Sequence, residues 1–562
     1  MKLIRLKINS SFRSLQQGFE IKFHSPTLSS DSFKSLGEFH PFCFAGLNGT
    51  GKSNVLEAIA SIFYHMECCA LKFQPDNFRK HFNARISTPD AFELEYFLMS
   101  TDAIPSIEST IKVKIEKNEG EIPIMKIDKF PFLRESDDLT TIEVQSTITG
   151  QRAVSKGFLP EFIIAYSSGE NETLSIPFIK MKLLQYDEYI DALEKNEKYE
   201  KPESGLLYMD YELSQAVLLA NVLFQEEEIL ASLREELGIV RIKSFRLYIT
   251  LHKHEFRDSN GAPHKKILTE QLNVKIEKLK NCATSWFQDE AGITIDFYFD
   301  KNTKDAVKSN FDDAFSFFQT LKIFYVLNHR IVEDYMKEGV YQSKGYYTEN
   351  KIPVASPEDH AFYFLDYYIE TLKSEKPLLM RQLSDGEHQF LYTMGICLLL
   401  RNQRSIMLLD EPETHFNPDW RSKFIKILKN TIATAGSNNL LKEIVLTSHS
   451  PFIISDCLPD KVVVFEKNEH TENKVICKYA SEFDPPFNTY GTAIDIIVEK
   501  IFKNINTIGE FSKSELQKID FDKIKSDNDR NDAKKSIAHL GDSIEKDLTL
   551  IRLNKLNFNS NA

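Results

Sequence analysis

Residues 46–53 have the types and the spacing that bind a phosphate chain. They read Gly-Leu-Asn-Gly-Thr-Gly-Lys-Ser and match the P-loop pattern at every fixed position. In such a loop the glycines let backbone N–H groups face the phosphates, the lysine reaches the outer phosphates, and the serine hydroxyl binds Mg²⁺. We therefore expect ATP and Mg²⁺ as cofactors. The predicted nucleotide-binding residues are Asn48, Gly49, Thr50, Gly51, Lys52, Ser53 and Asn54.

Two adjacent carboxylates follow an apolar run later in the chain. Residues 405–409 are Ser-Ile-Met-Leu-Leu, and Asp410 and Glu411 come directly after them. A buried strand that ends in acids is typical of a Walker B element, which presents charge at the sheet edge where nucleotides bind. We expect Asp410 to hold Mg²⁺ together with Ser53, Glu411 to polarise the attacking water, and Lys52 to act on the β- and γ-phosphates. The alternative is a buried strand followed by two solvated acids.

A third segment, Leu383-Ser384-Asp385-Gly386-Glu387, resembles the LSGGE signature of ABC-type ATPases. In that superfamily two heads sandwich ATP, and the signature of one head binds the γ-phosphate held at the P-loop of the other. The resemblance implies that Ser384 and Gly386 contact the nucleotide of a partner head, with a helix N-terminus behind them. The same residues also fit a capping box between Ser384 and Glu387, and both interpretations can hold together.

A histidine completes the series. Residues 444–451 read Ile-Val-Leu-Thr-Ser-His-Ser-Pro and resemble the switch-histidine strand of ABC heads. His449 is therefore expected to contact the γ-phosphate and to position the attacking water, although a histidine met alone is more often structural. Residues 167–170 form a tetrapeptide similar to the signature. Its distance from Asp410 in the sequence excludes it as the signature.

The residues after Glu411 indicate a branch of the superfamily. Residues 410–418 are similar to the DEPExHxxP run of the SMC/RecF/OLD-like (AAA_21-type) ATPases, which also carry a large insert between P-loop and signature. Residues 382–390 and 415–421 look most like PtuA, the ATPase subunit of the Septu anti-phage systems, including its retron-associated relatives. Related heads often place a basic residue beside the nucleotide, so the resemblance implies that role for Arg13.

The resemblance implies an ATP-hydrolysing sensor that controls an associated nuclease. Its implied partners are a second copy of the chain, at least as a homodimer of heads, a separate HNH nuclease subunit called PtuB, and in retron-associated relatives a reverse transcriptase with its DNA and RNA. We find no nuclease centre in this chain. Two Asp-x-Asp pairs, at 520–522 and 527–529, lie in a polar tail without the buried strand that a Toprim metal site needs, and we interpret them as solvated acids.

Composition predicts a folded protein with more than one structural unit. The chain has 562 residues, of which 42% are hydrophobic and 27% are charged, and its net charge is −13. A surface of that charge repels nucleic acid as a whole. The seven cysteines follow no zinc or disulfide pattern, and the apolar runs are too short for a signal peptide or a membrane span. We therefore expect a cytoplasmic protein without membrane contact.

The periodicity of apolar residues predicts an α/β fold. It consists of an ABC-type P-loop ATPase head, with a mixed sheet and an antiparallel lobe, that is split by a helix-dominated insertion and followed by a helical tail. Within the insertion, the spacing predicts strands at 239–248 and 293–298 and a helix over 311–336. The expected parts are the first half of the head (1–175), the insertion (176–375), the second half of the head (376–490) and a tail for partner binding or oligomerisation (491–562).

Two other functions remain open from the sequence. The chain could be a scaffold locked by bound nucleotide, with little turnover, or an SMC/RecF-like DNA-repair ATPase. A DNA-repair role needs a basic surface, and the basic segments found here are modest. They lie at 275–280, near Trp286, and at 421–426, and we interpret both as solvated helix faces.

Overall fold

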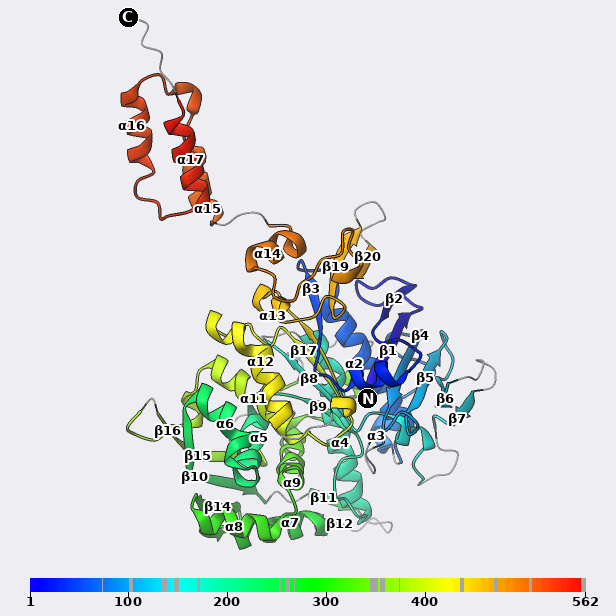
Figure 1. The fold of residues 1–562 in the computed structure, drawn as a ribbon. Coiled ribbons are helices and arrows are strands. Elements are labelled where there is room, and N and C mark those ends of the chain that lie inside the picture. The colour runs from blue at the N-terminus through cyan, green and yellow to red at the C-terminus, as the bar shows by residue number, and fades with distance from the viewer. Residues whose placement is uncertain are drawn as a thin grey trace, which may run out of the picture. The chain divides into compact units, whose positions relative to one another are not determined.

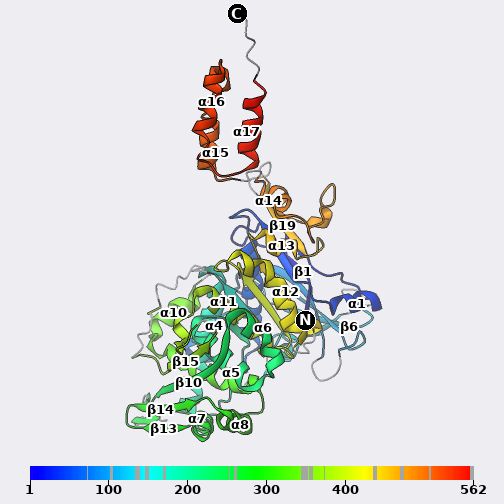
Figure 2. The ribbon, with the colours of Figure 1, turned by 60° about the vertical axis from the view of Figure 1, so that its left-hand side comes forward.

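The computed structural model describes residues 1–556, apart from 73, 101–104, 133–138, 146–150, 169–171, 252–253, 258–262, 267, 344–351, 354–358, 373, 435–438, 469–473 and 505–507. The chain divides into two compact units, Met1–Tyr490 and Gly491–Ala562. Figures 1 and 2 show both units as ribbons from two sides. The boundaries that we predict inside the first unit stay predictions.

A mostly parallel sheet forms the centre of the first unit. Its strand order is β20-β19-β3-β18-β17-β8-β9, and all neighbours run parallel except β19 and β20. Long apolar runs with little alternation build these strands, as expected for a sheet that is covered on both faces. The strands are β3 (Phe42–Gly46), β8 (Phe162–Ser167), β9 (Leu206–Tyr208), β17 (Ser405–Asp410), β18 (Lys442–Thr447), β19 (Val462–Asn468) and β20 (Lys474–Tyr479).

Helices cover both faces of this central sheet. On one face α2 (Lys52–Ala70) packs against β3, β18, β17 and β8. On the other face α11 (Asp385–Leu399) contacts the sheet, because the Cys397 thiol lies 3.5 Å from the sulfur of Met407 and Lys442 donates to the carbonyl of Cys397. Ile406 and Leu408, on either side of Met407, belong instead to the core that contains α2. The strand thus alternates between two buried faces.

An antiparallel sheet flanks α2 on its other side and forms the predicted lobe, seen at the right in Figure 1. Its order is β2-β1-β4-β5-β6-β7. The ring of Phe63 on α2 meets the ring of Tyr96 on β4 edge to face, with the ring centres 5.8 Å apart. The strands are β1 (Lys2–Ile8), β2 (Phe19–Lys22), β4 (Phe92–Leu98), β5 (Ile111–Lys117), β6 (Ile124–Lys129) and β7 (Thr140–Ile142), with α1 (Ser30–Leu36) and α3 (Asp76–Arg79) in the connections.

The insertion between the two halves of the head combines helices with a second antiparallel sheet. The sheet has the order β13-β14-β10-β15-β16, and it lies with α7 and α8 at the bottom of both ribbon views. Its strands are β10 (Ile239–Thr250), β13 (Ser285–Gln288), β14 (Gly292–Tyr298), β15 (Phe362–Thr371) and β16 (Leu378–Leu379), and a separate hairpin is formed by β11 (His254–Arg257) and β12 (Pro263–Lys266). The predicted strands at 239–248 and 293–298 are confirmed.

The helices of this region account for its mainly helical character. They are α4 (Glu172–Lys195), α5 (Tyr211–Phe224), α6 (Glu227–Leu237), α7 (Glu270–Cys282), α8 (Lys301–Asn310), α9 (Ala314–Val326) and α10 (Asp334–Gln342). The single helix predicted over 311–336 is wrong. Asp313 caps α9 through a reciprocal hydrogen-bond pair with Ser316, and the chain tightens into a 3₁₀ turn at Leu327–Ile331 before it becomes extended at Val332.

The second unit is helical, as predicted. It contains α14 (Ile494–Phe502), α15 (Glu510–Gln517), α16 (Asp527–Ser536) and α17 (Ile544–Asn554). Its buried core consists of Leu516, Ile537 and Leu553.

The remaining helices of the first unit are α12 (Pro418–Thr434) and α13 (Pro451–Ser455). Within the described ranges, no helix has the length and apolarity that crossing a membrane requires.

Candidate active site

The P-loop connects the end of β3 to the start of α2, as predicted. Gly46 has φ +132° and Gly51 has φ +93°, both in the region that side chains disfavour. A Cβ on Gly46 would lie 2.3 Å from the carbonyl oxygen of Phe465, and one on Gly51 would lie 2.7 Å from the hydroxyl of Ser14. These glycines therefore let the loop turn tightly between β19 and the first residues of the chain, so that α2 starts directly at Lys52.

The ammonium group of Lys52 lies folded over the loop. It donates to the carbonyls of Gly46 and Leu47, each at 2.9 Å, and the side chain is buried. Burial lowers the pKa of Lys52 to about 8, while the carboxylates of Glu411 and Asp410 act in the opposite direction. A lysine with that pKa still carries its charge at pH 7, next to the N-terminus of α2, where an anion is favoured.

Asp410 is the point where three elements meet. Its Oδ1 accepts from Ser53 of α2 at 2.8 Å and from Thr447 of β18 at 2.6 Å, and its Oδ2 lies 3.5 Å from the Ser167 hydroxyl of β8. The sheet register explains this arrangement, because Asp410 pairs with Thr447 on one side and with Ser167 on the other. The carboxyl ends of β18 and β8, together with the start of α2, thus place hydroxyls around the buried carboxylate at the end of β17.

The residues at this point fit a magnesium ion. Ser53 and Asp410 offer adjacent hard oxygen atoms, the ligand type that Mg²⁺ prefers, and Mg²⁺ in nucleotide sites takes one or two protein ligands while phosphates and water supply the rest. Over the described ranges, no group of three or more histidine, cysteine, aspartate or glutamate side chains is arranged to hold a metal ion. The prediction that this chain lacks a nuclease centre stays a prediction.

Glu411 and His449 lie side by side next to Asp410. The Nε2 atom of His449 is 3.3 Å from Oε1 of Glu411, and both side chains are partly exposed. The backbone of Glu411 has φ +49°, and its N–H donates to the Thr447 hydroxyl at 3.0 Å. This hydrogen bond holds an unfavourable backbone conformation that turns the carboxylate away from the strand.

The pKa values of Glu411 and His449 suit a general base beside a neutral imidazole. Burial is the main cause that raises the pKa of Glu411, and Asp410 raises it further. Burial, with the charge of Lys52, lowers the pKa of His449 to about 4, so the imidazole is neutral at pH 7. Because a raised pKa makes a carboxylate a stronger base, Glu411 can accept a proton from water while His449 supplies a neutral hydrogen-bonding partner.

Two further residues, missed by sequence reasoning, support the loop that carries Glu411. Glu413 is buried, and its Oε1 accepts a short hydrogen bond from Ser448, the residue before His449. Burial raises the pKa of Glu413 to about 7. Arg421, which we interpreted as part of a solvated helix face, donates to the carbonyls of Glu413 and Thr414 at 3.3 and 2.9 Å. That interpretation is wrong for Arg421, because the loop folds back over the first turn of α12.

Thr447, Ser167, Glu413 and Ser448 could have been found from a simple signal. Thr447, Ser448 and Ser167 lie at or just after the ends of the two strands that neighbour the Walker B strand, and Glu413 follows the Walker B strand itself. The sequence does not predict the order of the strands in the sheet. Without that order, a hydroxyl at the end of one strand cannot be assigned to a side chain at the end of the next strand. Gly169 and Glu170, which belong to the tetrapeptide that we excluded as a signature, lie outside the described residues.

Arg13 has a position close to the P-loop helix. Its guanidinium donates to the buried carboxylate of Glu57, with Nη2 2.8 Å and Nε 3.1 Å from Oε1. Burial raises the pKa of Glu57 and Arg13 counteracts this effect. The neighbouring Ser14 donates to Asn54 at 2.7 Å. The residues after β1 therefore clamp the first two turns of α2, and the predicted contact of Arg13 with nucleotide stays a prediction.

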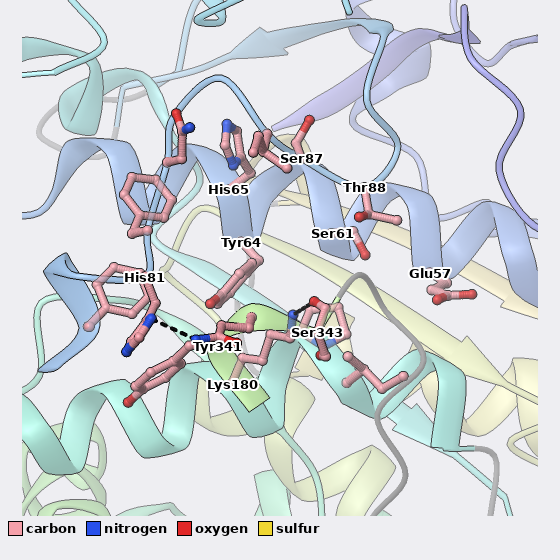
Figure 3. A pocket seen from close by; sticks show the side chains of 17 residues that line it. Glu57, Ser61, Tyr64, His65, His81, Ser87, Thr88, Lys180, Tyr341 and Ser343 are labelled. Atoms are coloured by element: carbon pink, nitrogen blue, oxygen red, sulfur yellow. Dashed lines mark hydrogen bonds between the residues drawn. The ribbon is translucent and has the colours of Figure 1, made fainter. Parts of the chain in front are cut away.

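Glu57 also lies at the edge of a cavity of about 240 Å³ next to α2, α4 and α10. Figure 3 shows the side chains of Tyr64, His65, Lys180 and Tyr341 around it. Lys180 donates to the Ser343 carbonyl at 2.5 Å. The residues that line this cavity do not include 46–54, so it is separate from the P-loop. The Nε2 atom of His65 donates to the Ala84 carbonyl at 3.0 Å, and the side chain is buried.

Ser384 and Gly386 start helix α11. Ser384 caps the helix in a reciprocal hydrogen-bond pair with Glu387, so the capping-box interpretation is confirmed. A Cβ on Gly386 would lie 2.7 Å from the carbonyl oxygen of His415, which shows how closely the helix start packs on the loop after Glu411. The Gln389 side chain accepts from the His415 N–H at 3.4 Å. The contact of Ser384 and Gly386 with a partner head stays a prediction.

The acidic pairs in the second unit have local partners. Asp520 caps a short turn by accepting from the N–H of Asp522, and Asp527 and Asp529 lie in the first turn of α16 behind the cap Ser526. Negative charge in the first turn of a helix is stabilising in itself.

In the insertion, Lys280 lies over the Trp286 ring, 4.3 Å from its centre.

A family model and solved structures show similarity to this chain. Residues 217–455 match the family model AAA_21, described as "AAA domain, putative AbiEii toxin, Type IV TA system". No curated protein matches the chain. Among solved structures, the SMC head domain from Thermotoga maritima aligns with 10% sequence identity and a TM-score of 0.29, over 85% of this chain and 99% of that one. The matched range includes the signature, Walker B and switch-histidine segments. The mostly parallel sheet, with the P-loop between β3 and α2, confirms the predicted α/β P-loop fold class.

Proposed function

We propose that this chain binds and hydrolyses MgATP between paired heads, and that this cycle controls an associated HNH nuclease in an anti-phage defence system. The observation that carries the ATPase part is the convergence of Ser53, Thr447 and Ser167 on Asp410, with Glu411 and His449 directly beside it. This is the residue set that in-line attack of water on a γ-phosphate requires, assembled from segments far apart in the sequence.

The P-loop supplies the binding part of the mechanism. Its backbone N–H groups and the N-terminus of α2 offer positive potential to the phosphates. Lys52 exchanges its two carbonyl acceptors for phosphate oxygens, which restores the solvation that burial removes from its ammonium group. The Arg13–Glu57 clamp holds the first turns of α2 in place, so the N–H groups keep their direction.

The Walker B segment supplies the catalytic part. Mg²⁺, if bound here, would supply positive charge that offsets the charge of the phosphates. Ser53 and Asp410 offer the oxygen atoms for it, and Thr447 keeps the Asp410 carboxylate oriented. Glu411 takes the proton of the attacking water, and His449 holds the water or the γ-phosphate oxygen through a neutral nitrogen.

Pairing of heads completes the site in this proposal. Ser384 is exposed at the start of α11, where a partner's γ-phosphate can be reached by its hydroxyl and by the helix N-terminus. Gly386 allows the start of α11 to lie close to the carbonyl of His415 because it carries no Cβ. Since α11 packs on the loop after Glu411 through Gly386, closing of the heads and the geometry of Glu411 are mechanically connected.

The regulatory part rests on resemblance. Residues 382–390 and 415–421 resemble the corresponding segments of PtuA, whose relatives act with a separate HNH nuclease and, in retron systems, with a reverse transcriptase and its DNA and RNA. The second unit offers a place for a protein partner, since Phe511, Ile544, Leu548 and Ile551 are exposed there. We place the role in the cytoplasm, where the nucleotide and the genome of a phage are available.

A Glu411→Gln variant tests the catalytic assignment. We expect single-turnover hydrolysis of ATP to fall at least about a hundredfold, while ATP binding persists, because the amide keeps the size but cannot accept the proton. The matched control is Glu290→Gln, an exposed residue on the loop before β14. Hydrolysis at the parent rate by Glu411→Gln would refute the assignment. Negligible turnover by the parent, with and without its partner, would favour the nucleotide-locked scaffold.

The regulatory proposal is tested separately in cells. In this experiment, cells express this chain together with the product of the neighbouring gene. The numbers of plaques that a panel of phages forms are then compared between the parent chain and Lys52→Ala. Loss of protection in Lys52→Ala, with an HNH nuclease as the neighbouring gene product, is the expected result. A neighbouring transporter membrane subunit, or protection that does not depend on Lys52, would contradict the defence role and leave the ATPase assignment intact.

A further inference from the structure

A cavity of about 620 Å³ lies at the edge of the central sheet where β8, β9 and β17 begin. Asp410 and Ser167 mark the other ends of these strands, so the cavity and the P-loop site lie at opposite edges of the sheet. The volume lies within the usual range of small-molecule sites. Its walls come from the turn before β8, the loop between α4 and β9, helix α9, and the residues before β17.

Cations predominate in the lining of this cavity. Five basic side chains face it, whereas two acidic side chains do, Glu161 and Glu203. This excess of positive charge stands out in a chain with a net charge of −13. A local cationic cavity in an acidic protein attracts small anions while the rest of the surface repels them. The basic residues are Arg152, Lys156, Lys201, Lys322 and Arg404.

Three of these cations have acidic partners. Arg404 donates to Glu161, with Nε and Oε1 3.2 Å apart, and Lys156 forms a short ion pair with the buried Glu67. Arg152 lies 3.8 Å from Glu203. The other two differ: over the described ranges, Lys201 and Lys322 form neither a hydrogen bond nor an ion pair. The cavity therefore holds two cations that remain available to an anion.

Lys322 is the more unusual of the two. It lies on the face of α9 that turns to the cavity, with Gln319 one turn and Phe315 two turns before it. Burial is the largest cause that lowers the pKa of Lys322 to about 8, and the charges of Lys182 and Lys156 lower it further. The nearby Glu188 acts in the opposite direction, but burial raises the pKa of that carboxyl itself to about 8. A partly desolvated ammonium group among like charges gains much from a bound anion.

Beside the charges lies an aromatic wall. The rings of Phe162 and Phe315 meet edge to face, 5.2 Å between centres, and both line the cavity. The side-chain amides of Gln319 and Gln403 offer donors and acceptors on the same lining. A flat, polar-edged ring system suits such a wall, because aromatic faces stack on it and amides bind its edges.

We propose that this cavity is a second ligand site, for a phosphorylated nucleoside, whose phosphates bind Lys322 and Lys201 and whose base packs on Phe315. The proposal goes beyond the ATPase function and is independent of it. Helix α2 connects the two sites, since it begins with Lys52 in the P-loop, and its last turns carry Glu67, the partner of Lys156 at the cavity.

Titration calorimetry on the full chain tests the site, with ADP and inorganic pyrophosphate as probes. All proteins carry Lys52→Ala, so that binding to the P-loop is weakened. We expect this background to bind ADP at one site, and to bind pyrophosphate more weakly because it has no base. Lys201→Glu, a change of an exposed residue that leaves the fold intact, and Lys322→Gln are each expected to weaken ADP binding about tenfold or more.

Lys308→Gln, an exposed lysine on α8, is the matched control and is expected to change nothing. Absence of ADP binding in the Lys52→Ala background at millimolar ADP would overturn the proposal. So would binding that is equal in the background, Lys201→Glu and Lys322→Gln, because the P-loop would then be its source. Equal affinity for ADP and pyrophosphate would overturn the assignment of a nucleoside. None of these results affects the ATPase assignment, which depends on the turnover of Glu411→Gln.

Discussion

Replacement of Thr447 by valine tests whether the hydroxyls around Asp410 hold the Walker B segment in its working geometry. Valine has nearly the shape of threonine, so the change removes one hydroxyl and leaves the packing of β18 almost intact. Two hydrogen bonds are lost, the one that Thr447 donates to Asp410 at 2.6 Å and the one that it accepts from the N–H of Glu411 at 3.0 Å.

The magnitude follows from the kinds of hydrogen bond. A bond to a charged group contributes about 1.5–3 kcal/mol and a neutral one about 0.5–1.5 kcal/mol, so Thr447→Val should lower the free energy of unfolding by about 2–4 kcal/mol. A unit that spans Met1–Tyr490 has an unfolding entropy of roughly 1 kcal/mol per kelvin, so Tm should fall by about 3 °C. Because Glu411 loses the bond that fixes its backbone, kcat for ATP hydrolysis should fall at least about tenfold.

The assay combines differential scanning calorimetry with steady-state ATP hydrolysis at saturating Mg²⁺. The matched control is Thr393→Val, which also removes one buried threonine hydroxyl, but one that donates to the helix carbonyl of Gln389 at 3.0 Å, away from the site. We expect the control to lose about 1 kcal/mol and to keep its kcat. An equal loss of stability in both variants, with unchanged hydrolysis by Thr447→Val, would refute the reasoning.

Three further outcomes are expected. Arg13→Ala should lower the free energy of unfolding by about 3–5 kcal/mol in urea titrations, because it leaves the buried Glu57 carboxylate unpaired. The double replacement Arg13→Met/Glu57→Leu should recover most of this loss, and no recovery would show that the unpaired carboxylate is not its cause. The raised pKa of Glu413, about 7, means that the folded state binds this proton more tightly than the unfolded state, so stability falls as pH rises from about 4.5 to 7. Glu413→Gln lacks this slope, and the stability advantage of the parent over the variant, largest below about pH 4.5, should shrink by about 3 kcal/mol by pH 8. Gly46→Ala should abolish soluble expression or nucleotide binding. Gly120 also has a positive φ but open space around it, so Gly120→Ala should do neither.

Much of the candidate site follows from local sequence. The P-loop, the acids at the end of β17, the capping box at Ser384 and the histidine after β18 are each contiguous, and their chemistry depends on the order of a few neighbouring residues. A glycine loop between an apolar strand and a helix can be recognised without knowledge of the rest of the chain. The same holds for the paired strands that open the antiparallel lobe.

The supporting contacts could not be predicted in this way. Thr447 and Ser167 reach Asp410 only because β18 and β8 lie on either side of β17, and strand order depends on how the helices pack rather than on any one strand. The break between α9 and α10 also escaped the periodicity, since apolar spacing continues through it while the cap at Asp313 and the turn at Leu327–Ile331 interrupt the helix. Arg421 resembled a solvated charge because nothing local shows that the loop of Glu413 folds back over it.

The sequence by itself determined which groups can do chemistry on a nucleotide, because the P-loop and Walker B residues act through local backbone geometry and fixed residue types. Only the tertiary structure decided how these groups are held, through hydroxyls from neighbouring strands around Asp410 and a salt bridge at the start of α2. It also revealed the cationic cavity at the opposite sheet edge, whose lysines lie far apart in sequence. The physical reason is that burial and electrostatic coupling depend on distances in space, which a linear pattern of residues does not contain.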